Sequence, residues 1–141
     1  MNQPPPSLNT STTPLRVFLV EDSAPVRDLM LENLSDIPGL LFTGFADTEA
    51  GALADLKLDA RDVVIFDIEL KQGNGISLLR SLAAASLLRD TLKIIFSNNV
   101  STAYRRVGQQ YGVQYFFDKT SELSQLRGLL QRLRQGIPQN S

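Results

Sequence analysis

The sequence predicts an α/β fold in which helices cover both faces of a five-stranded parallel sheet. Five short apolar runs, rich in β-branched and aromatic residues, alternate with five segments whose apolar residues recur at helical spacing. Glycine, proline, asparagine and serine lie between these runs, where they mark turns and helix ends. Such alternation is typical of a parallel sheet whose connections are helices.

Composition limits the kinds of site that the chain can build. The 141 residues are 43% hydrophobic and carry a net charge of −1, which predicts one domain with a full core and no general affinity for nucleic acid. The absence of cysteine and histidine excludes thiol and imidazole chemistry and the common zinc sites. No apolar stretch approaches the roughly 20 residues that span a bilayer, and the N-terminus lacks the features of a secretory signal. We therefore expect a cytoplasmic protein without membrane contact.

The ends of the chain differ in composition from its middle. Residues 1–14 contain four of the seven prolines among Ser, Thr, Asn and Gln, which predicts a disordered tail. We expect the folded domain to occupy residues 15–136, and residues 137–141 to form a short C-terminal tail.

The first strand is predicted at residues 15–20, where the run is apolar. Ser23 then supplies a helix cap and Pro25 suits the first helical turn. Apolar residues at helical spacing continue to Ile37, and the Pro-Gly pair at 38–39 ends this helix.

The second strand is predicted at residues 40–45 and the second helix at 47–58. The third strand, residues 63–66, is apolar throughout, which indicates a strand buried on both faces. Turn residues follow it, and a third helix is predicted at 75–85.

The last part of the chain repeats the pattern twice more. A fourth strand is predicted at residues 91–96, a fourth helix at 100–111 and a fifth strand at 113–117. The last helix, to about residue 136, has one stripe of leucines that we expect to pack against the sheet. Right-handed crossovers place all the strand ends at one edge, and we predict the flavodoxin-like order 2-1-3-4-5 in a three-layer sandwich.

Polar side chains come directly after four of the five predicted strands. They are Glu21 and Asp22 after the first, Asp67 after the third, Ser97 after the fourth and Lys119 after the fifth. Any one of them is more often a turn former, a helix cap or a surface charge. Their joint position at one sheet edge, where α/β proteins bind ligands, indicates a functional site.

The residue types suit phosphoryl transfer. Carboxylates crowded into one cleft repel each other unless a hard dication lies between them, and oxygen ligands favour Mg²⁺. Lys119 and the Ser97 hydroxyl can contact phosphoryl oxygens. Asp67 is then the candidate nucleophile, which would form an acyl phosphate.

These residues resemble the receiver domain of two-component response regulators, of the chemotaxis-regulator type. The resemblance covers residues 15 to about 135 and includes intervals of 45, 30 and 22 residues between Asp22, Asp67, Ser97 and Lys119. It implies that Asp67 accepts a phosphoryl group from a sensor histidine kinase or a phosphotransfer protein. It also implies that Asp22, Asp67 and the Glu69 backbone carbonyl hold Mg²⁺, with Glu21 helping through water, and that Ser97 and Lys119 contact the phosphoryl group.

The resemblance implies further roles and shows departures. Phe116 matches the aromatic switch of the family, which rotates inward as the serine moves toward the phosphate, although a plain core phenylalanine is the alternative. Glu69 and Asn99 fall at two positions that tune dephosphorylation. The family usually has proline after the lysine, where this chain has Thr120; Asn98 replaces a small residue, and Lys71 stands where proline is frequent.

We expect a signalling domain rather than a turnover enzyme, with autodephosphorylation as its own limited activity. Output is expected through the fourth helix, fifth strand and last helix to a downstream protein, and a phosphorylation-dependent dimer is a further expectation. The candidate contacts on the fourth helix are Tyr104, Arg105, Arg106 and Gln109, although the arginines are equally consistent with a solvated face.

Two other functions stay open from the sequence. The first is a receiver-like binding module that signals without phosphorylation, which the departures at Thr120 and Asn98 would permit. The second is a phosphatase with Asp67 as nucleophile, of the haloacid-dehalogenase kind. That family needs a second aspartate two residues later, where this chain has Glu69, and usually carries a cap insertion.

Overall fold

The computed structural model describes residues 13–136 and contains the predicted parallel sheet. Its strands, in chain order, are β1 (Leu15–Val20), β2 (Leu40–Ala46), β3 (Val63–Phe66), β4 (Leu92–Ser97) and β5 (Val113–Asp118). The sheet order is β2-β1-β3-β4-β5 and each neighbouring pair is parallel, so the predicted flavodoxin-like order is confirmed. The expected tails lie outside the described residues, apart from residues 13 and 14.

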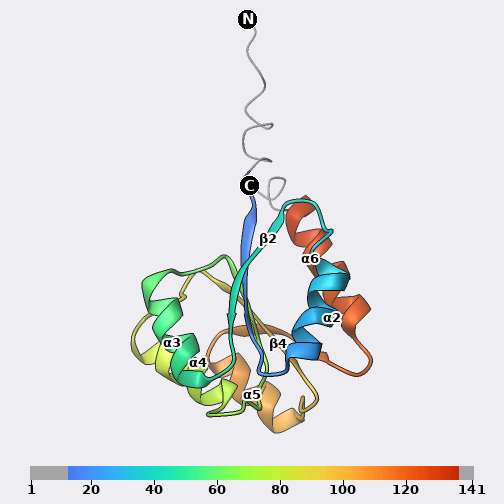
Figure 1. Cartoon of the computed structure of the whole chain (residues 1–141). Coiled ribbons are helices and arrows are strands. Elements are labelled where there is room, and N and C mark those ends of the chain that lie inside the picture. Colours follow the sequence, from blue (N-terminus) through green and yellow to red (C-terminus); the bar gives the residue numbers. More distant parts are fainter. Residues whose placement is uncertain (1–12, 137–141) are drawn as a thin grey trace, which may run out of the picture.

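Five helices cover the two faces of the sheet (Figure 1). They are α2 (Ala24–Leu34), α3 (Glu49–Leu58), α4 (Gly75–Ala84), α5 (Thr102–Gln110) and α6 (Leu123–Gly136). Helices α2 and α6 lie together on one face, and α3, α4 and α5 lie on the other (Figure 1). Within the described range, no helix combines the length and the apolar character that a membrane span requires.

The core consists of two apolar layers, one on each side of the sheet. All four residues of β3 are buried, as expected for a central strand covered on both faces. Its alternate side chains divide between the layers, because successive residues of a strand point to opposite faces. Val64 and Phe66 join the layer beneath α3 and α4, whereas Val63 and Ile65 join the layer beneath α2 and α6.

Side-chain caps fix where the helices begin. Ser23, Thr48, Asn74 and Ser101 each accept a hydrogen bond from a backbone N–H of the first helical turn. Several of the predicted boundaries differ from the observed ones by one to three residues, and two of these differences have a clear cause. Helix α3 begins at Glu49, two residues after the predicted start, because Thr48 is its cap. Helix α2 ends at Leu34, three residues before Ile37, although Ile37 is still buried.

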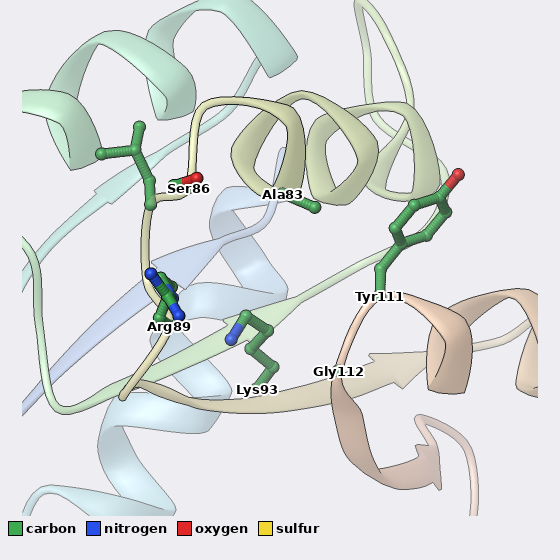
Figure 2. Close-up of a pocket in the computed structure, with 7 residues that line it drawn as sticks. Ala83, Ser86, Arg89, Lys93, Tyr111 and Gly112 are labelled. Carbon is green, nitrogen blue, oxygen red and sulfur yellow. The ribbon is translucent and has the colours of Figure 1, made fainter.

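Lys93 is buried at the amino end of β4, away from the edge where the strands end (Figure 2). Its Nζ donates hydrogen bonds to the backbone carbonyls of Leu88 and Thr91. Burial lowers the pKa of Lys93, and the charge of Asp90 only partly opposes this effect. A pocket of about 310 Å³ adjoins the lysine and is also lined by Tyr111.

Candidate functional site

Three carboxylates converge where β1 and β3 end. Glu21, Asp22 and Asp67 each offer one oxygen, and these oxygens lie within 4.8 Å of one another. Glu21 is 3% exposed and Asp67 is 6% exposed, so two of the three acids are nearly removed from water. Because hard oxygen ligands and close negative charges favour a divalent cation, the donor set fits a magnesium ion.

The sheet itself places these acids side by side. The Asp67 N–H donates to the Val20 carbonyl at 2.8 Å, which continues the ladder between β3 and β1. The Glu21 N–H donates to the Ala46 carbonyl at 3.0 Å, which ties the other acid to the end of β2. Backbone hydrogen bonds therefore hold both carboxylates at the edge, as the parallel topology predicts.

Lys119 joins the two buried acids. Its Nζ lies 2.8 Å from Glu21 Oε1 and 2.7 Å from Asp67 Oδ2. Burial raises the pKa of Glu21, and the hydrogen bond and charge of Lys119 oppose that rise only in part. Burial alone would lower the pKa of Lys119, but its hydrogen bonds to Asp67 and Glu21 outweigh this effect and the pKa is raised. The three carboxylates of the cluster outnumber the one ammonium that contacts two of them, so these four groups together carry net negative charge when all are ionised.

The Ser97 hydroxyl is buried at the end of β4, as predicted, and contacts its own loop. It accepts a hydrogen bond from the Asn99 N–H at 3.2 Å. The Asn99 amide nitrogen in turn donates to Glu69 Oε2 at 3.0 Å. The two positions expected to tune dephosphorylation are therefore linked to each other across the loops that follow β3 and β4. Asn98 and Lys71 are both exposed.

Phe116 is already buried, with 8% of its surface exposed. Its ring lies against Gly108 of α5, where an added Cβ would come within 2.8 Å of two ring carbons. The Arg105 guanidinium carbon lies 5.3 Å from the ring centroid. A buried ring fits a plain core phenylalanine as well as the inward position of a switch, and the switch role stays a prediction.

The Thr120 position differs from the family pattern but forms a defined turn. Both the Thr120 N–H, at 2.8 Å, and its hydroxyl, at 2.6 Å, donate to Asp118 Oδ1. The hydrogen bond from the Thr120 hydroxyl is the main reason that the pKa of Asp118 is lowered. The Lys119 N–H donates to the Ser97 carbonyl at 3.1 Å, so the lysine is positioned without the usual proline. The described residues contain no cis peptide bond.

The sequence did not single out one acid that adjoins this site. Glu49, in the first turn of α3, accepts hydrogen bonds from the Asn74 N–H at 3.0 Å and from the Ser77 hydroxyl at 2.8 Å. These partners lie 25 and 28 residues further along the chain. Only the position of Glu49 at a helix start was visible from the sequence, and such acids are common there.

Comparisons with known proteins agree with this geometry. The family model of the response regulator receiver domain matches residues 17–131. Two curated relatives are protein-glutamate methylesterase/protein-glutamine glutaminase proteins. The Anaeromyxobacter dehalogenans protein is 32% identical over 94 residues, which are 67% of this chain and 25% of the relative. The Xanthomonas campestris pv. campestris protein is 35% identical over 89 residues, which are 63% of this chain and 24% of the relative. The match thus spans about a quarter of the length of either relative.

Solved structures show the same fold. The response regulator domain of Thermotoga maritima CheB is 25% identical, with a TM-score of 0.73 and coverage of 89% of this chain and 97% of that one. The receiver domain of the putative regulator NarL from Mycobacterium tuberculosis is 22% identical, with a TM-score of 0.75 and coverage of 88% and 98%. The match of the family model to most of the chain, on a sheet with this acidic edge, shows that the chain belongs to the response regulator receiver domain family.

Proposed function

We propose that this chain is a phospho-accepting receiver, in which Asp67 takes a phosphoryl group from a phospho-histidine of a sensor kinase or phosphotransfer protein. The observation that supports this most directly is the bridge of Lys119 between Asp67 and Glu21 in a cluster of three acids. That arrangement joins a nucleophile to a fixed positive charge, and it leaves net negative charge that a dication would balance.

In the proposed reaction, an Asp67 carboxylate oxygen attacks the phosphorus atom and forms an O–P bond. The P–N bond to the donor imidazole breaks as the O–P bond forms, and its electron pair stays on the imidazole nitrogen. The Lys119 ammonium, already 2.7 Å from Asp67, is close enough to contact an incoming phosphoryl oxygen. The Ser97 hydroxyl would release the Asn99 N–H and donate to a second oxygen.

Mg²⁺ would be held by Asp22, Asp67 and the Glu69 backbone carbonyl, with Glu21 helping through water. When bound, it supplies positive charge that offsets the carboxylates and the phosphoryl oxygens. Glu69 and Asn99 are proposed to set the lifetime of the acyl phosphate, because their mutual hydrogen bond joins the two loops beside Asp67. Replacement of Glu69 by Asn should therefore change the rate of phosphate loss.

The signal would leave through the surface of α5, β5 and α6. Phe116 packs against Gly108 of α5, so a change in its packing would alter that helix directly. Tyr104, Arg105, Arg106 and Gln109 on α5 are the proposed contacts for a downstream protein or for a phosphorylated second copy. The relatives' name describes an enzyme of which only about a quarter aligns with this chain, so we propose no esterase activity for this domain.

The test is incubation of the full chain with Mg²⁺ and a small acyl phosphate such as acetyl phosphate, followed by intact mass measurement. We expect one phosphoryl group per chain on the wild type, none on Asp67→Asn, and one on Asp28→Asn, which changes an exposed acid on α2. No uptake by folded wild type in saturating Mg²⁺ would favour a binding module that signals without phosphorylation. Sustained hydrolysis of phosphate monoesters, lost in Asp67→Asn, would favour the phosphatase instead.

A further inference from the structure

The loop after β3 is a small hairpin that Glu49 anchors from outside the site. Glu69 and Asn74 pair as an antiparallel bridge, so residues 69–74 fold back on themselves. Glu69 begins this hairpin two residues after Asp67, and its N–H lies 3.4 Å from Asp67 Oδ1. The position of the hairpin therefore decides where the Glu69 backbone lies relative to the acceptor aspartate.

Three hydrogen bonds connect Glu49 to this loop and to the helix that follows it. Oε1 accepts from the Asn74 N–H at 3.0 Å, and Oε2 accepts from the Ser77 hydroxyl at 2.8 Å. The Glu49 N–H donates to the Gln72 carbonyl at 3.0 Å. Both carboxylate oxygens are therefore used, by partners on two successive segments.

The hairpin also approaches Glu49 so closely that residue 73 has no room for a side chain. Gly73 has φ +96°, and a Cβ added there would lie 2.3 Å from the Cβ of Glu49. Glycine is required here both by the backbone angle and by this contact. The close approach lets the Glu49 carboxylate reach past Gly73 to the Asn74 N–H.

A simpler role for Glu49 is to place a negative charge at the N-terminus of α3. That role needs a charge in the first turn but no particular length of side chain. It does not account for two acceptor contacts directed at Asn74 and Ser77. The two roles can be separated by substitution, because the helix-charge role depends on the negative charge of residue 49 and the hydrogen-bonding role depends on the length of its side chain.

We propose that Glu49 is a positioning residue: it fixes the 69–74 hairpin, and through the Glu69–Asn74 pair it fixes the backbone carbonyl of Glu69 for the divalent cation. The part of this inference that concerns the cation rests on the proposed function. The part that concerns how Glu49 fixes the hairpin does not depend on it. Partners outside the direct ligands commonly change metal affinity by about tenfold or more when they are removed.

Two substitutions at Glu49 separate the effect of side-chain length from the effect of charge. Glu49→Gln removes the charge but keeps the length, so its amide oxygen can accept from the Asn74 N–H while its NH₂ donates to the Ser77 hydroxyl. Glu49→Asp keeps the charge but is one methylene shorter, so it cannot span both partners. Ser77→Ala removes one contact and leaves Glu49 in place. Glu32→Gln, an exposed position on α2, is the matched control.

The first measurement is hydrogen exchange of the Asn74 amide by NMR, and the second is Mg²⁺ affinity from the amide shifts near Asp67. We expect Glu49→Asp to exchange faster at Asn74 and to bind Mg²⁺ about tenfold more weakly, with a smaller weakening in Ser77→Ala. Glu49→Gln and Glu32→Gln should match the wild type in both measurements.

The opposite ranking, with Glu49→Asp unchanged and Glu49→Gln impaired, would overturn the inference in favour of helix charge. Equal Mg²⁺ affinity in all four variants would also overturn it, while leaving the proposed function intact. If the wild type bound no Mg²⁺, the proposed function would be overturned, and so would the claim that Glu49 positions the Glu69 carbonyl for the cation. The Asn74 exchange rates would still decide whether Glu49 holds the hairpin.

Discussion

Gly75 lies so close to the Asp67 backbone that a single added methyl group should displace the acceptor aspartate. It is the first residue of α4, and its N–H donates to the Ile68 carbonyl at 2.7 Å. A Cβ at this position would lie 2.2 Å from the Asp67 carbonyl oxygen, 0.8 Å inside the 3.0 Å below which real Cβ contacts essentially do not occur. Both sides of this contact are backbone held by hydrogen bonds, so neither can rotate away. We therefore expect Gly75→Ala to displace the Asp67 backbone.

The size of the effect follows from three contributions. Overpacking typically costs about 1–3 kcal/mol, and loss of one backbone hydrogen bond costs about 1 kcal/mol. The higher helix propensity of alanine offsets up to about 1 kcal/mol. The unfolding free energy of Gly75→Ala should thus fall by about 1–3 kcal/mol, measured by urea denaturation. Uptake of phosphate from an acyl phosphate should fall as well, because Asp67 moves.

Gly128→Ala is the matched control on α6. Its added Cβ would meet only the flexible end of Arg132, at 3.3 Å. Alanine there should stabilise the protein by about 0.5–1 kcal/mol, since the helix gains propensity without a clash. If Gly75→Ala proved as stable as the wild type to within about 0.5 kcal/mol, the argument from close backbone approach would be wrong.

Three further outcomes follow from the charges. Lys119→Met leaves the buried Glu21 and Asp67 carboxylates without the Lys119 ammonium, so the unfolding free energy in the absence of Mg²⁺ should fall by about 3 kcal/mol. Urea denaturation in the presence of a chelator would measure this loss, and an unchanged denaturation midpoint would contradict the prediction. Lys93 has a lowered pKa in the folded state, so the unfolded chain binds more protons between that pKa and 10.5. The unfolding free energy of the wild type should therefore rise with pH in this window relative to that of Lys93→Met. Parallel pH profiles of the two proteins would contradict the lowered pKa of Lys93. Saturation with Mg²⁺ to about 100 times its dissociation constant should stabilise the wild type by about 2.7 kcal/mol in calorimetry, and Asp67→Asn should lose most of this gain.

The strands were the most predictable part of the fold. Residues 63–66 are apolar without interruption, which fits only a segment covered on both faces, and β3 has those bounds. Helix ends were less predictable because they depend on hydrogen bonds that composition does not reveal. Ile37 continues the apolar pattern of α2, but its N–H donates to the carbonyl of Leu34, only three residues earlier, so the chain has left the α-helical pattern by that point.

The members of the site could be predicted, whereas their partners could not. Glu21, Asp67 and Lys119 follow strands, and parallel topology brings strand ends to one edge whatever the intervening sequence. That topology does not tell which oxygen Lys119 contacts, nor that Glu69 and Asn99 bond to each other. Such pairings depend on side-chain rotamers and loop paths, which leave no periodic trace in the sequence.

The contacts around Lys119 also explain how a change at Asp67 could reach α5 without a large movement. The side chain of Lys119 binds Asp67, while its backbone N–H holds the end of β5 to the Ser97 carbonyl of β4. Phe116 lies three residues earlier on β5 and packs directly against Gly108. A phosphoryl group that drew Lys119 or Ser97 toward itself would therefore pull on the same strand end that carries this ring. Because the ring lies too close to Gly108 to admit a Cβ between them, a shift of the ring toward α5 would displace that helix and alter the surface that a partner would meet.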